Sequence, residues 1–179
     1  LQRALERAPG ILPVARSNAV PFDSGNDVLP VQKPGAANFL SPNHISVSPD
    51  YFSIYRIRIL AGRVLSDQRA DDRFYDLIDK DYAAKNEGHN VMVNAALTKT
   101  LGETPATILG KSFIFGKSHM TVVGVAADTL VNGARSPVQP LVYVYAPDRA
   151  QTLMIRVQPG REQEAMASVK RISRAFIPG

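Results

Sequence analysis

The segment that most constrains this chain covers residues 47–63, with the sequence VSPDYFSIYRIRILAGR. It places two neighbouring aromatic residues, Tyr51 and Phe52, directly after a Ser-Pro-Asp turn. Ser48 can accept hydrogen bonds from the free N–H groups of a helix start, and Pro49 suits the first helical turn. The segment therefore predicts a short helix whose aromatic residues are anchored in the core.

A strand is expected directly after this helix. Residues 56–60 read Arg-Ile-Arg-Ile-Leu, an alternation that puts Ile57 and Ile59 on one face of a half-buried strand. Gly62 then allows the chain to turn before Arg63. Together the two elements predict a helix and a strand that share one hydrophobic core.

The remainder of the chain alternates between helical and extended patterns. Helical patterns cover residues 1–8, 66–85, 94–101 and 162–176, and extended patterns cover residues 11–22, 44–48, 91–93, 111–115, 119–127, 141–145 and 152–157. Asn94 is expected to cap its helix, and Gly102 to end it in the left-handed conformation. Gly110 and Gly124 are expected to allow close backbone approach. This mixture of elements predicts an α+β fold.

Length and composition exclude several classes of protein. The chain has 179 residues, of which 45% are hydrophobic and 21% charged, as in ordinary globular domains. No apolar run approaches the roughly 18 residues that a membrane span requires. The absence of cysteine excludes disulfides, thiolate metal sites and cysteine catalysis. The net charge of +5 is not gathered into a basic block with aromatic residues, which argues against nucleic-acid binding.

The glycine-lysine motifs and the histidines do not form a recognisable site. Gly116-Lys117-Ser118 lacks the glycine that a phosphate-binding loop needs five positions earlier, where Lys111 stands. The three histidines, His44, His89 and His119, have no zinc-binding spacing. No serine lies in a G-x-S-x-G motif, so nucleophilic catalysis is not indicated. We therefore predict no catalytic, cofactor-binding or metal-binding residue, and a protein that is not an enzyme.

Acidic residues cluster between positions 67 and 87. The cluster includes Asp71, Asp72, Asp76, Asp79 and Asp81. A calcium-binding loop that began at Asp76 would need glycine at its sixth position, which is Asp81. Interleaved basic residues instead predict an exposed helical face with ion pairs. Asp50, next to the aromatic pair, is expected to stabilise the start of its helix.

Three segments, taken in order, resemble the MacB-like periplasmic core domain. They are YFSIYRIRILAGR at residues 51–63, NVMVNAALTKTLG at residues 90–102 and TVVGVAAD at residues 121–128. This domain is the extracytoplasmic part of permeases in the macrolide-exporter and FtsX-type class of ABC transporters. Three features depart from the family pattern: Arg56 replaces a usual glycine, Ala95-Ala96 replaces an acidic position, and the stretch of residues 69–88 is longer than expected. The resemblance therefore does not extend to a macrolide substrate.

The resemblance implies a specific organisation. Residues 1–62 and 140–179 would form a porter-like βαβ subdomain, and residues 63–139 a second, hairpin-rich α/β subdomain inserted in the middle. Residues 61–66 and 132–140, which connect the two, are expected to act as hinges. The division and its hinges follow from the family and not from the periodicity of the sequence.

The resemblance also implies a function and partners. The chain would be the periplasmic domain of a permease in the cell inner membrane, relaying ATP-driven conformational change to substrate efflux or release. Its partners would be a cytoplasmic ATP-binding subunit or domain, a second permease protomer and a periplasmic adaptor, with membrane contact through flanking helices outside this chain. Two alternatives are a non-transport binding or regulatory module and a small hydrolase whose triad assembles only in three dimensions.

Overall fold

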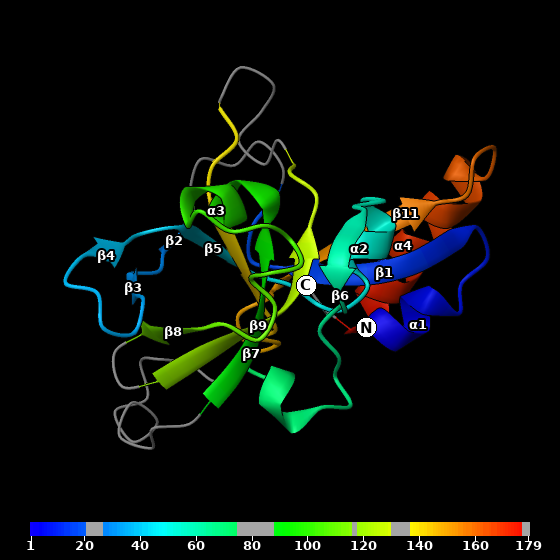
Figure 1. Ribbon diagram of the computed structural model, residues 1–179. Coiled ribbons are helices and arrows are strands. Elements are labelled where there is room, and N and C mark those ends of the chain that lie inside the picture. The colour runs from blue at the N-terminus through cyan, green and yellow to red at the C-terminus, as the bar shows by residue number, and fades with distance from the viewer. Residues whose placement is uncertain (21–26, 75–87, 116–117, 130–136, 177–179) are drawn as a thin grey trace.

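A computed structural model describes residues 1–20, 27–74, 88–115, 118–129 and 137–176 (Figure 1). The helices are α1 (Gln2–Glu6), α2 (Tyr51–Ile54), α3 (Ala95–Thr100) and α4 (Glu162–Phe176), with one 3-10 turn, η1 (Ala70–Asp72). The strands are β1 (Ile11–Ser17), β2 (Asp27–Val28), β3 (Val31–Gln32), β4 (Phe39–Leu40), β5 (Asn43–Ser46), β6 (Ile59–Gly62), β7 (Gly88–Asn94), β8 (Ser112–Phe115), β9 (Ser118–Ala126), β10 (Leu141–Val144) and β11 (Thr152–Val157). This mixture confirms the predicted α+β class.

A nine-stranded sheet forms the centre of the molecule. Its order is β2-β5-β10-β7-β9-β8-β3-β4, and β6 also pairs with β9. Although β2 and β4 are at opposite ends of this order, β2 connects to β3, and β4 to β5, through two-residue links. The links contact each other, since the Leu29 N–H donates to the Pro42 carbonyl at 2.9 Å. The sheet therefore curls until its two ends approach each other.

The curled sheet buries residues on both of its faces. Val91 and Val93 of β7 point into the core enclosed by the sheet, together with Leu97 of α3. Met92, between the two valines, belongs to a second core on the other face, where α2 packs. Because neighbouring residues of a strand point to opposite faces, β7 is buried on both sides. This explains why the strand is apolar throughout residues 91–93.

A smaller, two-stranded sheet covers α2 from the other side. It pairs β1 with β11 in antiparallel register. Its second face carries α1 and α4, which contact each other and lie side by side in Figure 1. Leu5 of α1, Val14 of β1 and Ile172 of α4 form the core of this layer. The first and last described helices therefore belong to one unit.

Several local predictions are confirmed. Tyr51 and Phe52 are both 3% exposed, and the Phe52 ring lies 5.0 Å from the Tyr143 ring. The Asn94 side chain caps α3 by accepting from the Leu97 N–H at 3.0 Å. The final helix covers residues 162–176 as predicted. These features depend on short-range sequence patterns.

The predicted start of α2 is wrong in its chemistry. The Ser48 hydroxyl does not cap the helix but accepts from the Arg16 N–H at 2.9 Å, because β1 lies beside it. Asp50 occupies the cap position without a side-chain hydrogen bond. Burial, with the charges of Glu6 and Asp67, raises the pKa of Asp50. Its carboxylate is therefore not stabilised in the way expected.

The strand expected at residues 56–60 begins later, at Ile59. Arg56 adopts a left-handed conformation with φ of 53°, alone among the described non-glycine residues, and this interrupts the extended backbone. Ile57 and Ile59 still pack against the core that contains α2. The hydrophobic alternation thus identifies the buried side chains but misplaces the start of the strand.

The expected hinge at residues 61–66 stays a prediction. This segment includes the end of β6, and its Arg63 N–H donates to the Val123 carbonyl at 3.0 Å. The other expected hinge overlaps residues 130–136, which lie outside the described residues. The central sheet runs from one predicted subdomain to the other through the β10–β7 pair. The division into residues 1–62 with 140–179 and residues 63–139 stays a prediction.

Candidate functional site

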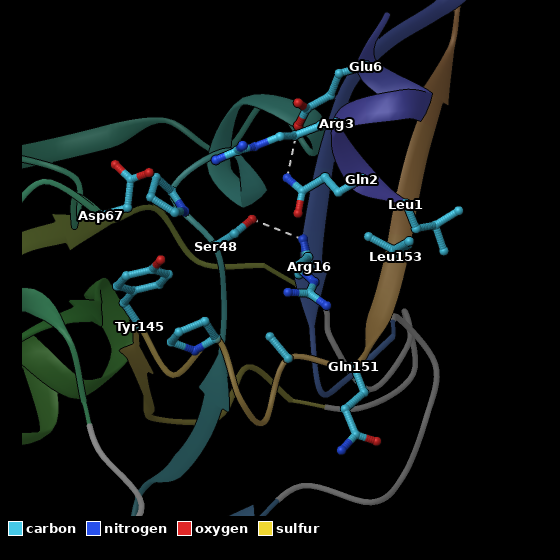
Figure 2. A pocket seen from close by; sticks show the side chains of 13 residues that line it. Leu1, Gln2, Arg3, Glu6, Arg16, Ser48, Asp67, Tyr145, Gln151 and Leu153 are labelled. Carbon is cyan, nitrogen blue, oxygen red and sulfur yellow. Dashed lines mark hydrogen bonds between the residues drawn. The ribbon is translucent and has the colours of Figure 1, made fainter. Parts of the chain in front are cut away.

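The candidate site is a groove between the two-stranded sheet and the central sheet, here called the α1 groove (Figure 2). It has a volume of about 580 Å³. One wall comes from α1, the end of β1 and the start of β11, and the other from segments that follow β5, β6 and β10. Its polar lining residues include Gln2, Arg3, Glu6, Arg16, Ser48, Asp67, Tyr145 and Gln151.

Arg16 lies at the centre of the α1 groove, where the fold fixes its backbone on both sides. Its N–H donates to the Ser48 hydroxyl and its carbonyl accepts from the Ser48 N–H, each at 2.9 Å. The guanidinium projects from this anchored strand among the lining side chains (Figure 2). Its Nε atom is buried and has no hydrogen-bond partner in the described part of the chain. The groove therefore contains a cation that has an unused hydrogen-bond donor at a buried atom.

Carboxylates line another part of the same groove. Glu6 accepts from the Gln2 side chain at 2.9 Å, and Asp67 accepts from the Gln68 side chain at 3.2 Å. Both carboxylates add to the effect of burial in raising the pKa of Asp50, so their fields overlap there. In both cases the hydrogen-bond donor is a neutral amide.

Tyr145 forms part of the wall opposite α1. Burial raises the pKa of its hydroxyl, and the charge of Asp67 raises it further, whereas Arg73 and Arg16 lower it. The hydroxyl thus stays protonated at neutral pH and can donate a hydrogen bond. Acidic, basic and neutral donor groups are all present in the α1 groove.

An ion pair with a buried carboxylate fixes the segment that brings Asp67 to the groove. Arg63 donates to both Asp72 oxygens at 2.6 and 2.8 Å, while Asn90 and the Ser66 N–H donate to Asp72 at 2.7 and 2.8 Å. Burial alone would raise the pKa of Asp72, but these hydrogen bonds outweigh it and lower the pKa. The chain around Asp67 is therefore held against β7.

This finding corrects the interpretation of the acidic cluster. Asp72 is fully buried, whereas an exposed helical face was expected, because Asn90 on a distant strand supplies one of its partners. Asp71 is exposed, as predicted. Asp76, Asp79 and Asp81 lie outside the described residues. Sequence spacing grouped these residues, but it carries no signal for the long-range contact of Asp72.

The structure does not bring the histidines together. His89 is buried, and its Nδ1 lies 3.1 Å from the Arg73 carbonyl. His119 on β9 is exposed, and His44 is half-buried on β5. No group of three or more metal-binding side chains occurs in the described ranges. Within the same ranges, no helix is long and apolar enough to cross a bilayer.

Comparison with known proteins gives one family and several related structures. The family model for the MacB-like periplasmic core domain matches residues 3–172. No curated protein sequence matches the chain. Three similar solved structures are the periplasmic region of MacB from Actinobacillus actinomycetemcomitans, a domain assigned to a permease protein from Porphyromonas gingivalis, and the extracellular domain of the noncanonic ABC-type transporter YknZ from Gram-positive bacteria.

The three structures agree in fold over almost the whole chain. Their TM-scores are 0.62, 0.64 and 0.60, with sequence identities of 15%, 13% and 12%. They cover 98%, 98% and 97% of this chain, which corresponds to 72%, 75% and 80% of the other chains. At these identities the structures establish the fold, and the family model establishes the relationship. The chain belongs to the family of MacB-like periplasmic core domains, the periplasmic domains of MacB- and FtsX-like ABC transporter permeases.

Proposed function

We propose that this domain relays ATP-driven conformational change to substrate efflux or release. In this proposal it lies in the periplasm, and helices that flank α1 and α4 anchor it in the inner membrane. A cytoplasmic ATP-binding subunit or domain supplies the driving change, and a second permease protomer and a periplasmic adaptor are the other partners. The domain contributes a mechanical linkage and no chemical step of its own.

The contact between α1 and α4 is the observation that carries this proposal. Both helices pack on the two-stranded sheet around Leu5, Val14 and Ile172. A movement that enters through either helix is therefore transmitted to β1. From β1 it reaches the central sheet through the hydrogen bonds between Arg16 and Ser48. Packed elements of this kind shift as units and not by continuous deformation.

The α1 groove gives this movement a direction. It lies between α1 on one wall and Asp67 and Tyr145 on the other, so the walls can approach or separate. The Arg16–Ser48 hydrogen bonds hold the layers together at the floor of the groove. We infer that the groove opens and closes during the transport cycle, with this floor as the axis.

A reversible cross-link across the groove tests the relay. Cysteines that replace Glu6 and Asp67 would lie on opposite walls of the groove, and both positions are exposed. The chain has no cysteine of its own to interfere. In the full-length transporter, a bifunctional thiol reagent that joins these cysteines through disulfides should stop transport. ATP binding should persist, and reductant should restore transport.

A matched control places both cysteines on one element, α1 and its C-cap residue. Positions 3 and 7 lie one helical turn apart, in α1 and at its C-cap. In the double variant Arg3→Cys/Arg7→Cys the same reagent therefore joins the two cysteines without bridging the groove. Transport should continue in this variant. Undiminished transport with the Glu6–Asp67 bridge fully formed would contradict the relay. That result would favour a static binding or regulatory module, which has no need of the movement.

A further inference from the structure

We propose that the α1 groove binds a small zwitterion with one carboxylate and one ammonium group, as in a free amino acid or a short peptide. The ligand carboxylate would bind the Arg16 guanidinium, and the ammonium group would lie toward Glu6 and Asp67. The volume of the groove, about 580 Å³, lies within the range of roughly 300–1,000 Å³ that small-molecule sites occupy.

Arg16 supplies the first half of the argument. A buried N–H without an acceptor is unfavourable, and the Nε of Arg16 has none in the described ranges. No ion pair of the described residues includes Arg16. A carboxylate matches the planar fork of a guanidinium with two parallel hydrogen bonds. Ser48 fixes the backbone of Arg16 on both sides, and this sets the direction in which the side chain leaves the strand.

The acidic lining supplies the second half. Glu6 and Asp67 together balance the formal charges of Arg3 and Arg16, so the lining residues carry no net formal charge. A multiply charged anion such as phosphate would be repelled by the two carboxylates. A ligand with separated opposite charges would be attracted at both ends. The charge pattern therefore favours a zwitterion over a simple anion.

The remaining walls suit a small organic ligand. Pro147, Ala150 and Leu153 provide apolar contact, and the Tyr145 hydroxyl provides a donor. Leucine and proline side chains contact an aliphatic residue without adding charge, so the walls do not compete with Arg16 for the carboxylate. The groove thus combines a few polar anchors with apolar walls, the usual character of small-ligand sites.

Three probes that differ by one charge test the inference on this chain. Trialanine carries both charges, its C-terminal amide lacks the carboxylate, and its N-acetyl form lacks the ammonium group. In ¹H–¹⁵N correlation spectra, trialanine should shift the amide signals of Arg16, Ser48 and Gln151. Each blocked form should bind about tenfold more weakly, since it loses one charge-assisted interaction. Free alanine in parallel separates the amino acid from the peptide as the preferred source of the zwitterion.

Two variants locate the binding. Arg16→Gln should weaken trialanine binding about tenfold. Arg7→Gln, which removes the same charge outside the groove, should leave it unchanged. Equal binding of trialanine and its amide, equal effects of the two variants, or no shift at the solubility limit of trialanine would each overturn the inference. The experiment measures binding and not transport. A negative result would therefore overturn the ligand inference and leave the proposed relay unaffected.

Discussion

Single residues determine how the segment after β6 is placed. Asp72 accepts from Arg63, Asn90 and the Ser66 N–H, and it has no exposed side-chain surface. A buried carboxylate without these donors would be strongly unfavourable. The same carboxylate with all of them fixes three segments in one geometry. The position of Asp67 in the α1 groove therefore depends on a residue that does not line the groove.

The backbone conformation of Arg56 is strained. Its left-handed conformation, with φ of 53°, costs an L-residue roughly 1–2 kcal/mol. Glycine adopts this conformation without that cost, although it loses more entropy on folding. Arg56→Gly should therefore increase the free energy of unfolding by about 0.5–1 kcal/mol, as measured by urea denaturation.

A neighbouring arginine provides the matched control for this change. Arg58 has a negative φ, and its carbonyl accepts from the Ala127 N–H at 2.8 Å. Arg58→Gly should lower stability by roughly 0.5–1 kcal/mol, because the added chain entropy has no compensation. If both glycine variants destabilise the domain, the left-handed backbone of Arg56 is not the source of strain.

At the scale of elements, the close pairing of β6 with β9 depends on two glycines. Gly62 and Gly124 are opposite each other in this antiparallel pair. A Cβ added at Gly62 would lie 2.2 Å from the Val123 carbonyl oxygen, and one added at Gly124 would lie 2.1 Å from the Arg63 carbonyl oxygen. Both contacts involve backbone, which cannot move aside without separating the strands. This confirms the close approach expected at Gly124.

Gly62 and Gly110 separate the effect of space from that of backbone conformation. Both have positive φ, 71° and 77°, but a Cβ at Gly110 would meet no atom within 4 Å. The close approach expected at Gly110 is therefore wrong, and its conformation alone explains the glycine. Gly110→Ala should cost about 1–2 kcal/mol from the left-handed backbone. Gly62→Ala should cost at least about 3 kcal/mol in urea denaturation, because the clash adds to the same strain.

The outcome for Gly62 and Gly110 has a clear alternative. Equal losses of stability in the two alanine variants would mean that β6 can move away from β9 at little cost. In that case residues 61–66 could still serve as the hinge that the family resemblance implies. A much larger loss for Gly62→Ala supports β6 as a fixed part of the sheet.

Elements set by local patterns could be predicted, and those set by distant pairing could not. The period of α4, the Asn94 cap and the buried aromatic pair are properties of a few neighbouring residues. The curl of the central sheet depends on the link between Leu29 and Pro42, and the α1 groove depends on Ser48 turning toward Arg16. These partners are far apart in sequence, and periodicity carries no information about such pairs.

At the scale of the whole molecule, one buried histidine makes stability depend on pH. Burial lowers the pKa of His89, and its hydrogen bond to the Arg73 carbonyl and the charge of Asp71 only partly compensate. Since a carbonyl cannot donate, the neutral ring carries its proton on Nδ1. The ring also packs edge-on against Phe74, with 5.4 Å between centroids. Protonation therefore adds a charge inside the junction of β7 and η1.

The sign of the effect follows from the direction of the pKa shift. An unfolded histidine titrates near about pH 6.5, and the folded pKa of His89 is lower. Between these two values the unfolded chain binds more protons, so its population increases as the pH falls. The contribution of His89 is thus present above about pH 6.5 and is lost as the pH falls through the folded pKa. Asp72, whose pKa is also lowered, adds a second loss below about pH 4.

We therefore expect the free energy of unfolding to decrease between about pH 7 and pH 5 in the native chain. His89→Gln keeps a donor for the Arg73 carbonyl but cannot be protonated, so its decrease over this interval should be smaller. His119→Gln removes an exposed histidine and should retain the native slope. The later loss from Asp72 should remain in both variants. If His119→Gln flattens the profile as much as His89→Gln does, exposed groups dominate the pH dependence. A flattening confined to His89→Gln identifies the buried ring between β7 and η1 as the group that titrates.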